Sequence, residues 1–138
     1  MADGSEAARE PVLVALTAPA RRSLVEGLVR APSISAIEGT PVLDADASDA
    51  DIADFLAGIA HAETGYIART ASGERAIAIV AATAAALCGE DIRAALTTPD
   101  LAFLTALKPP AVEALRSVLL AIETDAVDEV TRALHPLT

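Results

Sequence analysis

Residues 76–88 form the longest stretch of the chain without a charged side chain, and nothing in it is more polar than Thr83. Alanine dominates the stretch, and one side of a helix would carry Ile77, Val80, Ala81, Ala84 and Leu87. A helix that is apolar almost all round is typically buried in a core. We therefore expect a central buried helix here, with Gly89 as its C-terminal cap.

A β-hairpin at residues 65–80 is the alternative interpretation of this region. Residues 65–70 and 75–80 would be its strands, joined by the turn-forming residues 71–74. Alanine is depleted in strands, and the apolar run continues to Cys88, so the pattern favours the helix.

The clearest amphipathic pattern begins after Ser48. Ser48 and Asp51 resemble a capping box, in which a side chain accepts a hydrogen bond from the first turn of a helix. Beyond this cap, apolar residues recur at steps of three and four, namely Ile52, Phe55, Ile59, Ala62 and Tyr66. This spacing predicts a helix of about 20 residues.

Similar spacing predicts helices at residues 18–30, 100–107, 109–122 and 125–134, and a short turn or helix at 91–96. Residues 33–46 show no helical period and are expected to form a loop, with at most a short extended piece. The expected fold class is all-α, a compact bundle of five to seven helices around residues 76–88. An α+β fold is the alternative if the hairpin forms. Residues 1–10 are expected to be a flexible tail, and residues 11–138 a single helical domain.

Charge restricts the partners that such a fold can bind. Twenty acidic residues face ten basic ones, which gives a formal net charge of -10. Nucleic acids and anionic membranes attract basic surfaces, so we expect neither as a partner. As a helix, residues 76–88 would span about 20 Å, which is less than the hydrocarbon core of about 30 Å. That stretch is therefore too short to cross a bilayer.

Composition also bears on the cellular setting. Lys108 is the sole lysine beside several arginines, a bias typical of GC-rich bacterial genomes. The single cysteine, Cys88, excludes an internal disulfide, and the acidic N-terminus is unlike a signal peptide. We expect a cytoplasmic protein.

Three segments resemble known metal-binding or catalytic motifs, but each lacks residues or surroundings that the motif requires. Residues 38–54 hold six acidic residues and no base, but an EF-hand loop needs glycine in place of Asp49 and glutamate in place of Phe55. His61 and Glu63 have the spacing used by zinc deaminases, which also need two cysteines. Cys88 ends an apolar run, where burial is expected to make its thiol inert. We expect no metal, no cofactor and no catalytic residues.

Two functions remain in view. Apolar residues make up 53% of the chain, and one predicted helix has them on more than one side. We therefore expect a protein–protein interaction module (an adaptor, accessory subunit or assembly partner, self-association included), with a candidate interface of Val112, Leu115, Val118, Leu119 and Ile122. The alternative is a small-ligand-binding or catalytic helical domain, with an internal pocket near His61, Tyr66 and Cys88.

Overall fold

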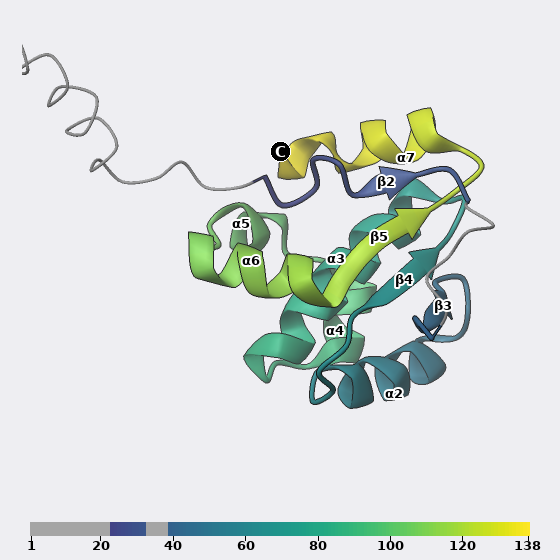
Figure 1. Ribbon diagram of the computed structural model, residues 1–138. Coiled ribbons are helices and arrows are strands. Elements are labelled where there is room, and N and C mark those ends of the chain that lie inside the picture. The colour runs from purple at the N-terminus through teal and green to yellow at the C-terminus, as the bar shows by residue number, and fades with distance from the viewer. Residues whose placement is uncertain (1–22, 33–38) are drawn as a thin grey trace, which may run out of the picture.

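The computed structural model describes residues 23–32 and 39–138 of the 138-residue chain (Figure 1). Its centre is a four-stranded, fully parallel sheet with the strand order β2-β5-β4-β3. The strands are short: β2 (Val29–Arg30), β3 (Val42–Asp44), β4 (Tyr66–Arg69) and β5 (Leu119–Glu123).

Six α-helices accompany the sheet in the described residues, which make this part of the chain a mixed α/β fold. Figure 1 shows α3 lying behind β4 and β5, with α2 and α7 at either side of it. The helices are α2 (Asp49–Ile59), α3 (Gly73–Cys88), α4 (Ile92–Thr97), α5 (Leu101–Thr105), α6 (Pro109–Val118) and α7 (Val127–Leu134), followed by the 3-10 turn η2 (His135–Leu137). None of the described helices combines the length and the apolarity that crossing a bilayer requires.

The all-α prediction is therefore wrong, and two segments account for most of the error. Tyr66 was assigned to the end of a long helix but begins β4, and Leu119 and Ile122 were assigned to a helix but belong to β5. In a parallel sheet both faces of a strand are buried, so a strand reads as a short apolar run without alternation. Such a run fits the continuation of a helical stripe equally well.

Helix α2 confirms the predicted start but not the predicted length. The Ser48 side chain accepts a hydrogen bond from the Asp51 amide at 3.2 Å, and the helix ends at Ile59. The chain then turns through Gly65 into β4. A side chain at Gly65 would lie 2.8 Å from the carbonyl oxygens of Ser117 and Val118, so only glycine lets β4 pass the junction of α6 and β5.

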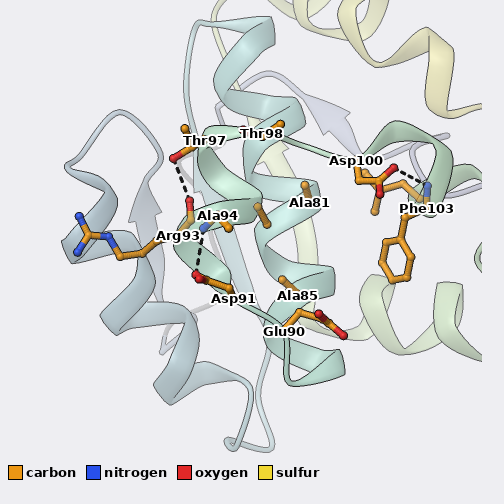
Figure 2. A pocket seen from close by; sticks show the side chains of 12 residues that line it. Ala81, Ala85, Glu90, Asp91, Arg93, Ala94, Thr97, Thr98, Asp100 and Phe103 are labelled. Carbon is orange, nitrogen blue, oxygen red and sulfur yellow. Dashed lines mark hydrogen bonds between the residues drawn. The ribbon is translucent and has the colours of Figure 1, made fainter.

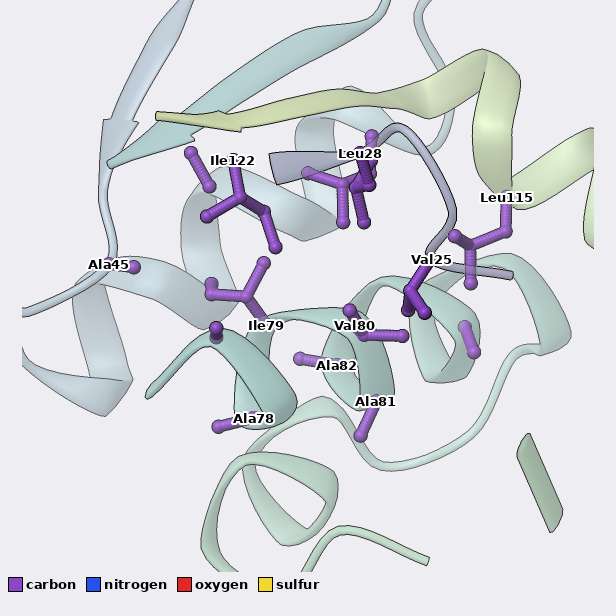
Figure 3. Close-up of a cluster of buried hydrophobic side chains, with 14 of the residues drawn as sticks. Val25, Leu28, Ala45, Ala78, Ile79, Val80, Ala81, Ala82, Leu115 and Ile122 are labelled. Atoms are coloured by element: carbon purple, nitrogen blue, oxygen red, sulfur yellow. The ribbon is translucent and has the colours of Figure 1, made fainter. Parts of the chain in front are cut away.

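Helix α3 confirms the predicted central helix and its cap. Gly89 has a φ of 73° in the left-handed region, and the helix buries most of its alanines. The hairpin alternative is wrong in its second half, because residues 75–80 are helical, although its first half includes β4. Figure 3 shows Ile79 and Val80 of α3 directed toward the side on which Ile122 and Leu28 lie, so that the helix covers this apolar face of the sheet.

The first predicted helix is also wrong over the residues that are described. Residues 24–28 form bends and turns, and Val29 and Arg30 form strand β2. Gly27 explains the break, since its φ of 73° is incompatible with a right-handed helix. The rest of that prediction, with the expected tail at residues 1–10, lies outside the described residues.

Candidate functional site

A groove with a volume of about 710 Å³ lies between α3, α4 and α5. Small side chains of α3 and α4 form its floor, and α5 supplies a wall with Phe103 and Leu104. Figure 2 shows the groove from close by. Its lining consists of Ala81, Ala85, Glu90, Asp91, Arg93, Ala94, Ala95, Thr97, Thr98, Asp100, Phe103 and Leu104.

Two aspartates fix the short helices that build this groove. Asp91 caps α4 by accepting a hydrogen bond from the Ala94 amide, and Asp100 caps α5 by accepting one from the Phe103 amide, each at 3.0 Å. Each capping carboxylate uses one oxygen in this contact, which leaves its second oxygen at the surface. The caps therefore also place negative charge along the rim.

The charge of the rim is predominantly negative. Glu90, Asp91 and Asp100 are all exposed. Arg93 is counted among the lining residues, but Figure 2 shows its side chain extending away from Ala81, Ala85 and Phe103. Three of the lining residues of the groove thus carry carboxylates.

Apolar side chains are unusually exposed on α5. Phe103 is 42% exposed and Leu101 38%, while the neighbouring Leu104 is buried. Most of the lining residues are open to solvent, so the hollow is a surface groove rather than an enclosed cavity. The lining residues offer apolar contacts and negative charge to a binding partner. The described residues contain no group of three or more His, Cys, Asp or Glu residues that could hold a metal ion.

A second polar site lies at the carboxyl edge of the sheet, where the arrowheads of β2, β5 and β4 meet in Figure 1. The strand register aligns Asp44, Arg69, Glu123 and Arg30 in one row across the four strands. The Glu123 side chain is fully buried and accepts hydrogen bonds from Arg69 Nε at 3.0 Å and from Arg30 Nη2 at 3.1 Å. Both arginine side chains are about half exposed.

Two opposing effects act on the Glu123 carboxyl. Burial raises its pKa, but the hydrogen bonds and positive charges of Arg69 and Arg30 outweigh burial, so the pKa lies below its ordinary value. Glu123 is therefore ionised and anchors both guanidinium groups at this edge.

A hollow of about 210 Å³ lies beside this row. The loops after β3, β4 and β5 supply most of its lining, which consists of Pro32, Asp44, Asp46, Arg69, Thr70, Ala71, Glu123, Thr124 and Asp125. Ligands of parallel sheets usually bind outside the carboxyl ends of the strands, which is the position of this hollow.

The predicted pocket residues do not meet. His61 is exposed in the turn after α2, and Cys88 is exposed at the end of α3, contrary to the expected burial of its thiol. Tyr66 is fully buried in the core and lies edge-on to Phe55, with the ring centres 5.2 Å apart. None of the three residues belongs to the groove or to the hollow at the carboxyl edge.

The polar contacts of Tyr66 are internal. Thr83 donates its hydroxyl proton to the Ile79 carbonyl, so Tyr66 must donate to the Thr83 oxygen, at 2.7 Å. Burial raises the pKa of Tyr66 well above its ordinary value, and the bond to Thr83 opposes only part of that rise. Tyr66 is therefore a satisfied core residue.

The candidate interface residues also lie in the core. Val112, Leu115, Leu119 and Ile122 are at most 1% exposed, and Val118 is half-buried against the same core. They belong to two elements, α6 and β5, rather than to one helix. Their apolar stripe is explained by packing within the chain. Among residues 23–32 and 39–138, the large apolar residues that are exposed are others: Val42, Leu101, Phe103 and Leu120.

The sequence prediction missed both sites. The caps at Asp91 and Asp100 are visible in the sequence as acidic residues before short apolar runs. The charged row depends on four strands, of which three were predicted to be helical or left unassigned.

Comparison of the chain with protein-family models, curated proteins and solved structures finds no match.

Proposed function

We propose that the protein is a protein-binding module, an adaptor or assembly partner, and that the groove between α3, α4 and α5 receives a basic amphipathic helix of another protein. The observation that carries this proposal is one open hollow that combines an apolar floor and wall with a rim of carboxylates. An amphipathic helix in a groove is a recurring mode of recognition, in which apolar anchors fill the hollow and charged residues contact its rim.

The apolar part of the groove supplies the affinity in this proposal. Phe103 lines the groove and leaves a large apolar area in water, which a docked helix would cover. Burial of apolar surface stabilises a complex by about 25 cal/mol per Å². The alanines of α3 and α4 form a shallow floor that lets a second helix approach closely.

The acidic rim determines the sign of the partner. Glu90, Asp91 and Asp100 would pair with lysine or arginine on the polar face of the incoming helix. The net charge of -10 attracts a basic partner over longer distances. A second copy of this chain carries the same acidic residues, so like charges oppose self-association through this face.

The size and openness of the groove favour a helix over a small molecule. A volume of about 710 Å³ would suit a drug-sized ligand, but such ligands bind in pockets that enclose most of their surface. Here most of the lining residues are exposed, so an apolar molecule of that size would keep much of its surface in water.

Fluorescence anisotropy with two labelled synthetic helices tests the proposal. Both helices carry leucine on one face, and the opposite face carries lysine in one and glutamate in the other. We expect saturable binding of the lysine helix, at least about tenfold weaker binding of the glutamate helix, and weaker binding of the lysine helix at high salt.

The chain offers a matched control for the apolar contact. Phe103 and Leu120 are both 42% exposed, but Leu120 lies in β5 and outside the groove. Phe103→Ser should weaken binding of the lysine helix about tenfold or more, because it removes a large apolar anchor. Leu120→Ser should leave the affinity unchanged. Equal effects of the two substitutions, or no effect of either, would show that the helix binds elsewhere and would overturn the proposal.

A further inference from the structure

The hollow at the carboxyl edge of the sheet has features that packing of the chain alone does not explain. Arg69 holds Glu123 through its Nε alone. A guanidinium carries five N–H donors, so the two Nη groups of Arg69 stay without a partner in the described residues. The buried carboxylate thus orients Arg69 and leaves its outer N–H groups at the hollow.

Thr124 adds a second donor at the same place. Its side chain is buried, and its oxygen accepts a hydrogen bond from the Ala126 amide at 2.9 Å. Within the described residues its own hydroxyl proton has no acceptor, and Thr124 lines the hollow. A buried donor without an acceptor is costly, so its presence at a hollow points to an acceptor on a ligand.

The remaining lining is acidic. Asp44 is the last residue of β3, Asp46 lies in the loop after it, and Asp125 lies in the loop after β5. Asp125 makes no hydrogen bond in the described structure, while Asp46 accepts one from Thr70 at 2.8 Å. Glu123 balances one of the two positive charges of Arg69 and Arg30, so three further carboxylates at the hollow stand beside one remaining positive charge. A simple anion would meet those carboxylates as like charges.

We infer that this hollow binds a small zwitterion, a molecule that carries one carboxylate and one ammonium group. Arg69 and Thr124 donate hydrogen bonds to the carboxylate of the ligand, and Asp125, with Asp44 and Asp46, faces its ammonium group. A volume of about 210 Å³ is the space of about seven water molecules, which is enough for a free amino acid. This site is separate from the groove, because the two linings share no residue.

Titration of the ¹⁵N-labelled full chain with small compounds tests the inference. Glycine, β-alanine and 4-aminobutyrate carry both charges at increasing separation, while propionate and propylamine each carry one. We expect at least one of the three zwitterions to shift the amide resonances of Thr70, Ala71 and Asp125 to saturation. Propionate and propylamine should bind at least about tenfold more weakly, since each leaves one wall of the hollow without a partner.

Three variants control the assignment. Asp125→Asn removes a charge that makes no internal contact, so it should weaken zwitterion binding without disturbing the fold. Arg69→Gln should abolish binding, with the spectrum used to verify folding. Arg132→Gln, at an exposed arginine of α7 that lines neither the groove nor this hollow, should change nothing. The inference is overturned if none of the zwitterions saturates, if propionate or propylamine binds as tightly as they do, or if binding survives both Asp125→Asn and Arg69→Gln.

Discussion

The two ends of helix α3 differ in their contacts with the rest of the chain. At its first turn, Ser72 accepts a hydrogen bond from the Arg75 amide, and Arg75 donates to the Ala45 carbonyl at 2.8 Å and pairs with Asp49 at 3.2 Å. Along its second half, Ala81 and Ala85 line an open groove, and Cys88 at its end is exposed. The same helix is thus anchored by polar contacts within the chain at one end and lines an open groove toward the other.

This difference shows which parts of the fold tolerate change. Near Gly73 and Arg75, side chains from distant segments meet closely, so substitutions there should affect folding. Around Phe103 the side chains are exposed and few partners would be lost, so substitutions there should affect binding instead.

The largest effect is expected at Gly73. A β-carbon at this position would clash with the β-carbon of Ala133 in α7. Gly73→Val should therefore lower the free energy of unfolding by about 3 kcal/mol, because it overpacks a buried helix contact. Urea denaturation at neutral pH measures this change.

Gly58 provides the control for Gly73. It is also a helical glycine, but a β-carbon there would meet nothing within 4 Å. Gly58→Ala should raise the free energy of unfolding by about 0.5–1 kcal/mol through helix propensity. If both substitutions stabilise the protein, the close packing of α3 against α7 is refuted.

A smaller effect is expected from the titration of Glu123. Because the pKa of this carboxyl in the folded protein lies below its ordinary value of 4.5, ionised Glu123 stabilises the fold above that pH. This contribution should disappear as the pH falls below 4.5 and through the folded pKa. Unfolding of the wild type and of Glu123→Gln, measured from neutral to acidic pH, should give curves that differ at neutral pH and converge in acid. A constant difference over the whole pH range would mean that the charge of Glu123 does not contribute.

The smallest effect is expected in the groove. Phe103→Ser and Leu120→Ser each replace a side chain that is 42% exposed, so each should change the free energy of unfolding by no more than about 0.5 kcal/mol. Thermal and urea unfolding check this result. A large loss for Phe103→Ser would indicate that Phe103 supports the fold, and its effect on peptide binding would then need a different explanation.

The sequence alone predicts the features that depend on residues close together in the chain. Ser48 and Gly89 were predicted as helix caps, and the structure confirms both. Residues 73–88 were recognisable because an alanine-rich run of that length suits a helix better than a strand. These features depend on residues that are close to one another in the chain.

The sequence was insufficient where distant segments determine the structure. Tyr66 lies seven residues after Ile59, and Leu119 lies seven after Val112, so both extend a helical pattern although both begin strands. The row of Arg30, Arg69 and Glu123 arises only when the strands align in register. The groove is lined by parts of three helices, α3, α4 and α5. The spacing of residues within any one of these helices does not predict it.

Hydrogen–deuterium exchange of the full chain, with and without a saturating amount of the lysine helix, tests the central claim most directly. Our account predicts slower exchange in residues 90–103, which carry the rim and the wall of the groove, and no change in residues 44–48, 70–75 and 123–126 at the carboxyl edge of the sheet. Protection confined to the carboxyl edge, or spread evenly over the acidic surface, would contradict the assignment of the groove as the protein-binding site.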